Sequence, residues 1–321
     1  MDRITAITQF KQWMFNRRLS RRTRECYLGH VKRYLASKAT GTAEEAVTDW
    51  LSTFATSKKS PTTQRQALNA VVAFYRALDR PLENLAPWAR PPEKHRIPTC
   101  VNEAEAEAII SLLPEPWNEI AAIMFGAGLR ISEVISLRAQ DLDSHAGTIT
   151  VRGGKGDKDR VTILPKSLIP ILAARYRKNR ALWQIDRLND RPGVYIPDSI
   201  ANKSPHAGTE WPWFWIYPSS SESTCPDSHI TRRHHLHPDA FSKALKKACS
   251  LARISKRITA HSFRHGFATC YLMRGGNIND LRELMGHADI QTTQVYLHCI
   301  PQLASRAESP LDRIIPFRRS A

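Results

Sequence analysis

The chain has 321 residues, of which 42% are hydrophobic and 24% charged, a composition typical of a globular protein with room for two domains. No run of about 18 apolar residues occurs, so the sequence predicts no membrane span. The 47 Lys and Arg against 30 Asp and Glu give a formal net charge of +17, so a polyanion is a more natural partner than an anionic membrane surface. A basic surface that merely keeps the protein soluble is the alternative.

Residues 1–86 are predicted to form a helical domain of four short helices, because apolar residues recur there at helical spacing. Thr42-x-x-Glu45 is a capping-box pattern that opens the third of these helices. Residues 11–40 carry nine Lys or Arg and a single acidic residue. The apolar stripes are expected to be core, and the arginines between them to face the polyanion: Arg21, Arg22 and Arg24.

Residues 87–100 are rich in proline, which cannot sustain a helix, and are predicted to be a linker to a second domain at 101–321. That domain begins with helical patterns and continues with two β-rich segments around the turn that holds Lys155. Helical patterns return from Ser167, lapse at about residue 191 and resume at Pro238. The stretch from about 191 to 237 is polar and turn-rich, and is predicted to be an insertion.

The second domain carries residues that suit phosphodiester chemistry without a metal. Arginine donates a planar pair of hydrogen bonds to phosphate, and a lysine on a hairpin loop can protonate a leaving alkoxide. His261 and Arg264 are three residues apart, so at a helix start they share one face. Each residue alone is weak evidence, because most tyrosines and helical histidines are structural. The combination, in chain order, is Arg130, Lys155, His261, Arg264, His287 and Tyr296.

In these motifs the chain resembles the tyrosine recombinases, the phage-integrase family. Gly-Leu-Arg130 is similar to the segment of the family's first arginine, His261-x-x-Arg264 to its H-x-x-R box, and Leu-Met-Gly-His287 to its second histidine segment. Tyr296 matches the nucleophile and Lys155 the hairpin lysine, with Lys158 as a nearby competitor.

The resemblance implies a mainly α fold with a small antiparallel β-sheet or hairpin, in which a helical DNA core-binding domain precedes an α+β catalytic domain. It further implies that Tyr296 attacks the scissile phosphate to form a 3′-phosphotyrosine, while Arg130 and Arg264 hold its nonbridging oxygens with help from His261 and His287. Lys155 would be the acid and Glu133 a supporting carboxylate. No cofactor or metal is expected.

The insertion resembles the one found in integron integrases. It contains an aromatic-Pro-Ser segment and Arg232-Arg-His-His235. The resemblance implies that the insertion binds bases extruded from a folded single-stranded recombination site, for which aromatic side chains offer stacking faces. The residues expected to contact DNA are Trp213, Pro226, Arg232, Arg233, His234 and His235.

Other interpretations of the insertion remain open. Its three tryptophans, at 211, 213 and 215, could simply pack the domain. Its histidines and one cysteine are candidate zinc ligands, although their spacing fits no common zinc pattern; they are Cys225, His229, His234, His235 and His237.

The sequence is therefore compatible with three functions. The first is an integron integrase that joins folded single-stranded cassette sites to a duplex site. The second is a recombinase restricted to duplex sites, such as a phage-type integrase or a chromosome-dimer resolvase, and the third is a noncatalytic DNA-binding relative. The complete set of six site residues argues against the third.

The resemblance also implies a homotetramer on DNA, in which the apolar tail at about 303–321 could dock on a neighbouring protomer. No export signal is visible at the N-terminus, and the six cysteines lack C-x-x-C spacing. A cytoplasmic protein of a bacterium is expected, with no membrane partner.

Overall fold

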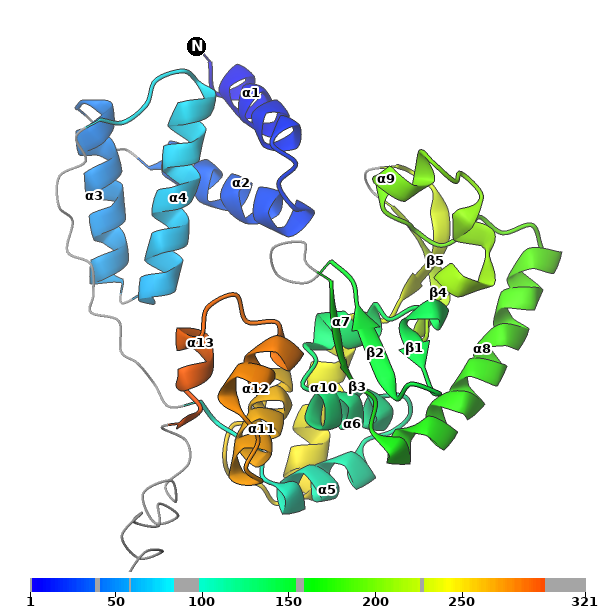
Figure 1. The fold of residues 1–321 in the computed structure, drawn as a ribbon. Coiled ribbons are helices and arrows are strands. Elements are labelled where there is room, and N and C mark those ends of the chain that lie inside the picture. The colour runs from blue at the N-terminus through cyan, green and yellow to red at the C-terminus, as the bar shows by residue number, and fades with distance from the viewer. Residues whose placement is uncertain are drawn as a thin grey trace, which may run out of the picture. The chain divides into compact units, whose positions relative to one another are not determined.

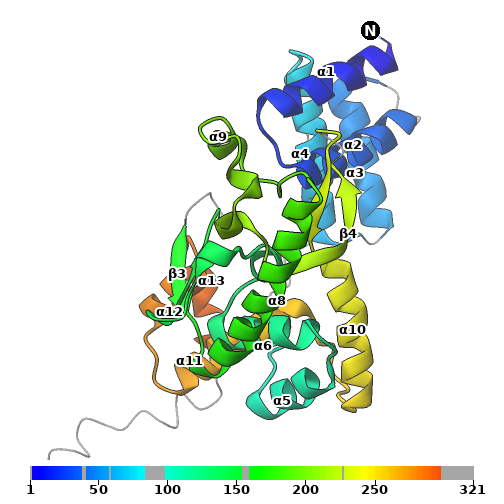
Figure 2. The same cartoon turned by 90° about the vertical axis from the view of Figure 1, so that its right-hand side faces the viewer.

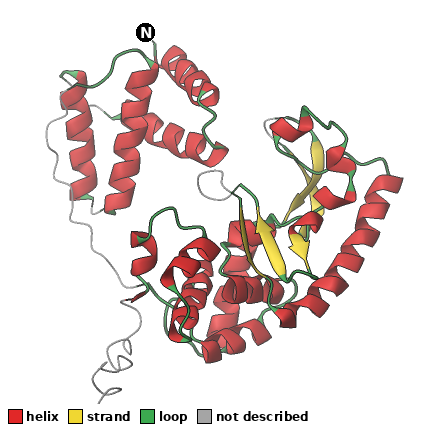
Figure 3. Cartoon of the chain, in the orientation of Figure 1, coloured by secondary structure: helices red, strands yellow, loops and turns green. Residues whose placement is uncertain are grey.

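The structure is a computed structural model, and it describes residues 2–37, 41–57, 59–83, 98–153, 159–225 and 228–297. The chain divides into two compact units, Met1–Arg96 and Ile97–Ala321. Figure 1 labels their elements, and Figure 3 shows that helices dominate both units while strands are confined to the second.

The first unit contains four helices: α1 (Arg3–Asn16), α2 (Arg21–Ala36), α3 (Ala43–Thr56) and α4 (Pro61–Ala77). Their starts follow from the sequence. The side chains of Asp2, Ser20 and Ser60 each accept a hydrogen bond from a backbone N–H in the first turn, which satisfies a donor that has no partner within the helix. At α3 the predicted capping box forms: the Thr42 N–H donates to Glu45 Oε2 at 2.9 Å.

The core of the first unit is built from the apolar stripes of these helices. Phe10, Met14, Val31 and Val71 are fully buried. The helical prediction for this part of the chain is confirmed, and the stripes are core rather than function.

The helices of the second unit are α5 (Glu103–Leu112), α6 (Trp117–Ala127), α7 (Ile131–Ile135), α8 (Ile169–Leu188), α9 (Asp198–Ala201), α10 (Pro238–Leu251), α11 (Ala260–Met273), α12 (Ile278–Met285) and α13 (Gln291–Gln294). In Figure 2, α5 and α6 lie between α10 and α11. The central part of this core is apolar, with Ile109, Ile123, Phe241 and Phe263 fully buried. No described helix is both long and apolar enough to cross a membrane.

Two small antiparallel sheets complete the second unit. The first has the order β1 (Leu142–Asp143), β2 (Thr148–Val151), β3 (Arg160–Ile163), and pairs Val151 with Arg160 at the start of the hairpin loop. The second consists of β4 (Pro218–Thr224) and β5 (Thr231–His235). The expected fold class, mainly helical with small antiparallel sheets, is confirmed.

The second sheet lies in the insertion, where the sequence predicted only polar turns. Strand β4 reads Pro-Ser-Ser-Ser-Glu-Ser-Thr and lacks the alternation of apolar residues that marks a half-buried strand. It is held by pairing with β5 and by an arginine described below, so its strand character depends on tertiary contacts.

Candidate active site

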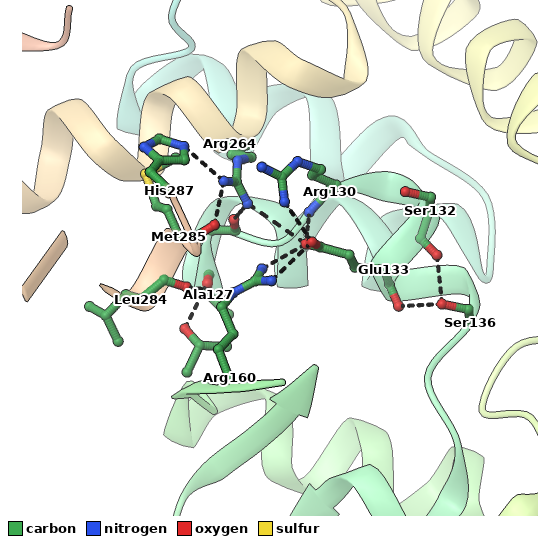
Figure 4. Close-up of polar contacts among 12 residues, drawn as sticks. Ala127, Arg130, Ser132, Glu133, Ser136, Arg160, Arg264, Leu284, Met285 and His287 are labelled. Atoms are coloured by element: carbon green, nitrogen blue, oxygen red, sulfur yellow. Dashed lines mark hydrogen bonds and ion pairs between the residues drawn. The ribbon is translucent and has the colours of Figure 1, made fainter. Parts of the chain in front are cut away.

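The carboxylate of Glu133, in the first turn of α7, lies at the centre of a cluster of three arginines (Figure 4). Its Oε1 accepts a hydrogen bond from Arg130 Nη1 at 2.7 Å, and its Oε2 accepts one from the backbone N–H of Arg130 at 2.7 Å. Arg160, at the start of β3, donates to both oxygens at 3.0 and 2.7 Å. Arg264 Nη1 lies 3.7 Å from Oε2. One carboxylate therefore orders guanidinium groups from three separate segments.

Glu133 stays ionised in this cluster. Burial on its own would raise its pKa, but the hydrogen bonds from Arg160 and the Arg130 backbone, together with both positive charges, outweigh burial and lower the pKa to about 2. The cluster keeps a net positive charge, because one carboxylate faces three arginines. Such a site favours an anion.

Arg264 extends from α11 and is buried, with 3% of its side chain exposed. Its Nη1 donates to the Gly128 carbonyl and its Nη2 to the Met285 carbonyl, both at 2.6 Å. Burial, followed by the charge of Arg130, lowers the pKa of Arg264 to about 10, which leaves the group charged at neutral pH. Two helix C-termini, those of α6 and α12, therefore fix its orientation (Figure 4).

His287 follows the end of α12 and contacts the same guanidinium. Its Nε2 lies 3.0 Å from Arg264 Nη2 and its Nδ1 lies 2.8 Å from Thr293 Oγ1. An arginine has no lone pair to offer, so Nε2 accepts here and the ring proton is on Nδ1, which donates to the threonine hydroxyl. This assignment follows from the hydrogen-bond partners.

Gly286 ends α12 with φ of 63°, in the left-handed region that side chains other than glycine rarely adopt. A Cβ atom at this position would lie 2.8 Å from Cδ of Arg160. Arg160 Nε also donates to the Leu284 carbonyl at 3.0 Å. The glycine before His287 therefore permits a close approach between the α12 turn and the base of the β2–β3 hairpin.

His261, in the first turn of α11, is accessible to solvent, although the neighbouring residues cover part of its ring. Partial burial of its ring, followed by the positive charges of Arg264 and Arg130, lowers its pKa from the ordinary value of 6.5, although Glu133 opposes the shift. His261 is thus neutral at neutral pH and can act as a hydrogen-bond donor or acceptor near the arginines.

Tyr296 lies just beyond α13 and is buried, with 3% of its surface exposed. Its ring is nearly parallel to that of His287, with an angle of 15° and centroids 6.3 Å apart. Its hydroxyl lies 2.9 Å from Nδ1 of His265. The structure thus brings together five of the six residues of the predicted set: Arg130, His261, Arg264, His287 and Tyr296.

Lys155, its competitor Lys158, Pro226 and the tail at about 303–321 lie outside the described residues. Two residues of the site were missed by sequence reasoning, Arg160 and His265. The spacing His261-x-x-x-His265 places both histidines on one helix face and could have drawn attention to His265. No local signal points to Arg160, because its contact with Glu133 depends on the β2–β3 pairing.

In the insertion, the tryptophans mostly pack internally. Trp211 and Trp215 are buried in a cluster with Phe214, while Trp213 is partly buried. The guanidinium of Arg138 lies 3.9 Å from the ring centroid of Trp215 and 5.1 Å from that of Trp213. Arg138 also donates to the Trp213 carbonyl at 2.7 Å. These contacts attach the insertion to the segment that follows α7.

Arg233 was predicted to contact DNA, but in the structure its guanidinium forms hydrogen bonds within the protein. It is 5% exposed and donates to both carboxylate oxygens of Asp186, at 2.6 and 2.7 Å. It also donates to the Ser219 and Ser220 carbonyls of β4, at 2.8 and 3.2 Å. Arg233 thus joins α8 to the β4–β5 hairpin, and its guanidinium is occupied by partners within the protein.

The other basic residues of the hairpin are partly exposed. His235 donates from Nδ1 to its neighbouring carbonyl at Leu236, and its ring meets Trp215 edge-on at 5.0 Å. Burial lowers the pKa of both His234 and His235, so both are neutral at neutral pH. Arg232 and His234 retain access to solvent. Within the described residues, no three His, Cys, Asp or Glu side chains are arranged to hold a metal ion.

In the first unit, the predicted DNA-facing arginines lie at the start of α2. Arg21 and Arg22 are exposed and Arg24 is partly exposed. Arg21 Nε lies 2.8 Å from the Glu25 carboxylate, and the Arg24 guanidinium lies 5.6 Å from the centroid of the Phe15 ring. An exposed ion pair of this kind contributes little to stability, so Arg21 can exchange its partner for a phosphate.

Comparisons with known proteins agree with this arrangement. Residues 100–302 match the Phage integrase family, and residues 7–84 match the N-terminal SAM-like domain of phage integrases. An "Integrase/recombinase" of Escherichia coli is 38% identical over 306 residues, covering 93% of this chain and 90% of that protein. The tyrosine recombinase XerA of Thermococcus kodakarensis is 28% identical, and the match covers 90% of this chain and 89% of that protein.

Solved structures show a similar fold. The Tn1549 transposon integrase in complex with circular intermediate DNA has a TM-score of 0.59 at 16% identity, and the match covers 91% of this chain and 94% of that one. The XerH site-specific recombinase bound to a palindromic difH substrate has a TM-score of 0.55 at 20% identity, over 89% and 78% of the two chains. On the family match and the sequence identity, this chain belongs to the phage-integrase family of tyrosine recombinases, enzymes that transfer DNA strands.

Proposed function

We propose that Tyr296 is the nucleophile of this recombinase and that it cleaves DNA through a 3′-phosphotyrosine. The observation that carries the proposal is the cluster of Arg130, Arg264 and Glu133 with the Tyr296 ring stacked beside His287. The covalent intermediate conserves the energy of the phosphodiester, so rejoining needs no energy source and no cofactor.

Each remaining residue has a proposed role in the same step. Arg130 and Arg264 hold the nonbridging oxygens of the scissile phosphate. His261 donates a further hydrogen bond to it, and His287 assists by accepting a hydrogen bond that orients Arg264. Glu133 orients the arginines. Lys155 protonates the leaving 5′ oxygen, with Lys158 as the competing acid.

Covalent trapping on a suicide substrate tests this proposal. In such a substrate a nick near the cleavage site lets the short 5′-hydroxyl fragment diffuse away, so the covalent complex accumulates. We expect the wild-type protein to form the complex and Tyr296→Phe to bind the same DNA without forming it. Equal trapping by the variant would contradict the assignment of Tyr296 as the nucleophile. Separate Lys155→Ala and Lys158→Ala variants identify the acid, because only loss of the acid slows release of the 5′ fragment.

For the substrate, we propose folded single-stranded sites recombined with a duplex site, as in an integron integrase. Support comes from the insertion, in which Trp213 is only partly buried and both Arg232 and His234 retain access to solvent. These side chains suit bases that protrude from a folded strand, since an aromatic or planar cationic face stacks on any base. Pro226 and His235 belong to the same proposed surface.

Recombination restricted to duplex sites is the second candidate. It is favoured by the fold similarity to XerH, whose structure was solved on a difH substrate. Binding of a bulged hairpin strand, compared with the same sequence as a fully paired duplex, separates the two. Tighter binding of the hairpin, lost when the protruding bases are deleted, supports the first; equal binding supports the second.

We further propose that the protein acts as a homotetramer, in which residues 1–86 and the catalytic domain at 101–321, joined by the linker at 87–100, both bind DNA. The apolar tail would dock on a neighbouring protomer. A pocket lined by Phe125, Ile163, Phe267 and Tyr271 offers an apolar surface for it. Truncation at Pro301 is expected to prevent tetramer formation on DNA without unfolding the protein; unchanged tetramers would argue against this role.

A further inference from the structure

His265 lies within hydrogen-bond distance of the reacting atom of the proposed nucleophile. It lies on α11, directly after Arg264 and one turn beyond His261. Its Nδ1 is 2.9 Å from the hydroxyl oxygen of Tyr296, and the two ring centroids are 5.5 Å apart. This hydrogen bond joins α11 to the segment after α13, across 31 residues of sequence.

The surroundings keep His265 neutral. Burial, followed by the neighbouring His261 and Arg264, lowers its pKa to about 4. The ionisable groups around it are His261 and Arg264 on α11, Tyr296 after α13, and His287, whose ring stacks on that of Tyr296. A neutral imidazole has one nitrogen with a free lone pair. Because a phenol donates a hydrogen bond more readily than it accepts one, Nδ1 is the acceptor and the ring proton is on Nε2.

We propose that His265 is a catalytic residue, the base that receives the phenol proton of Tyr296 during strand cleavage. The inference rests on the proposed role of Tyr296 as nucleophile. The hydrogen bond already joins the proton to its acceptor, at a distance within the range of 2.6–3.2 Å or so expected of a general base.

The step balances in atoms and charge. The Tyr296 oxygen forms a bond to phosphorus while the bond from phosphorus to the 5′ oxygen breaks, and the phenol proton passes to Nδ1 of His265. The leaving 5′ oxygen takes a proton from the general acid, so a 5′-hydroxyl departs. In rejoining, the 5′-hydroxyl attacks the phosphotyrosine and gives its proton back to the general acid, while the bond from phosphorus to the tyrosine oxygen breaks and His265 returns the proton to that oxygen.

The low pKa of His265 in the free protein does not oppose this role. Two of the groups that lower it, His261 and Arg264, are the ones proposed to contact the scissile phosphate. The negative charge of that phosphate offsets their contribution, so we expect DNA binding to raise the pKa of His265 in part, while burial, the largest cause of the shift, continues to lower it.

The test measures single-turnover cleavage of a suicide substrate at saturating protein, from pH 6 to 9, for wild type, His265→Asn and His265→Ala. The asparagine Oδ1 can take the place of Nδ1 as hydrogen-bond acceptor, but it cannot take a proton. His145→Gln is the matched control, because His145 is exposed in the β1–β2 turn, at the end of the sheet away from the hairpin loop.

We expect both His265 variants to bind DNA and to cleave it roughly 10²–10⁴-fold more slowly at pH 7. Their rates should rise about tenfold per pH unit, because the tyrosine must then ionise alone and its ordinary pKa is about 10. The wild-type rate should be nearly independent of pH over the same range. His145→Gln should behave as wild type.

A substrate with a sulfur in place of the bridging 5′ oxygen adds a second readout. A thiolate leaves without protonation, so this substrate is expected to restore cleavage to a variant lacking the general acid and not to His265→Asn. If His265→Asn cleaves at the wild-type rate, or more slowly with a flat pH profile, His265 is not the base. If the wild-type protein forms no covalent complex at all, it is the role of Tyr296 that fails.

Discussion

Arg160 and Glu133 form a two-point ion pair, with Nη1–Oε1 and Nη2–Oε2 distances of 3.0 and 2.7 Å, although 27 residues separate them in the sequence. The pair ties the base of the β2–β3 hairpin to the first turn of α7. Since Arg130 and Arg264 contact the same carboxylate, the position of the hairpin and the geometry of the phosphate site are coupled.

Replacing Arg160 by alanine should therefore affect both stability and cleavage. The side chain is 9% exposed, and removal of one member of a buried pair costs about 3–5 kcal/mol. Glu133 keeps its other arginines, so we expect the lower end of that range in urea unfolding, with slower covalent trapping. Arg274→Ala is the control, because its pair with Glu103 is exposed and contributes at most about 1 kcal/mol. Equal losses for the two variants would contradict the coupling.

Glu133→Gln should reveal a dependence of stability on pH. The folded pKa of Glu133, about 2, lies below its ordinary value of 4.5, so its contribution is fully present above pH 4.5 and is lost as pH falls toward 2. We expect the free energy of unfolding to be lower for the variant than for wild type at pH 7, and the difference to shrink between pH 4.5 and 3. A difference that stays constant over this range would show that the charge of Glu133 is not what stabilises the fold.

Gly286→Ala separates backbone strain from crowding at the site. Gly286 and Gly147 have φ of 63° and 67°, so alanine should cost each about 1–2 kcal/mol for the left-handed backbone. A Cβ at Gly286 would also meet Arg160 at 2.8 Å, whereas no atom lies within 4 Å of one at Gly147. We expect Gly286→Ala to be the less stable variant and to slow cleavage by displacing His287. Gly147→Ala should cleave as wild type; matching losses of cleavage in both would refute this explanation.

Arg233→Met and Arg232→Met should separate folding of the insertion from contact with DNA. Arg233 lies in a buried pair with Asp186, and its loss should lower the free energy of unfolding by about 3–5 kcal/mol. Arg232 is partly exposed, so its replacement should change the free energy of unfolding by only about 0.5 kcal/mol. The replacement should also weaken DNA binding and make the binding constant depend less steeply on salt concentration. Urea unfolding and binding titrations at several salt concentrations measure both effects. A stable Arg233→Met protein with weakened DNA binding would reverse the assignment.

Local patterns were enough for most of the helices, although not for the short α9 in the insertion. The Thr42–Glu45 cap, the proline that starts α10 and the apolar stripes of the first unit depend on neighbours within a few residues, and the structure has them where expected. The β4 strand and the internal role of Arg233 depend on partners far along the chain, such as Asp186, 47 residues away. The spacing of residues in the sequence does not predict contacts of this kind.

The residues of the candidate site show the same contrast between local patterns and long-range contacts. Arg264 and His261 could be recognised by their three-residue spacing, whereas Arg160 enters the site only through strand pairing, and His265 through the folding of the last described segment back onto α11. The alternative that the tryptophans of the insertion pack the domain describes Trp211 and Trp215, which are buried, while Trp213, the one predicted to contact a base, is partly buried. Whether a large aromatic side chain is covered depends on α8 and on the segment after α7, neither of which adjoins it in sequence.

The three arginines around Glu133 also bear on how the barrier to cleavage is lowered. Three positive charges against one negative charge leave a net charge of two. A phosphodiester carries a single negative charge, but the five-coordinate phosphorus formed after a deprotonated phenol attacks carries two. For the proposed reaction, the fixed charge of the site therefore complements the transition state better than the bound substrate, and the hydrogen bonds that hold the arginines are present in the DNA-free protein.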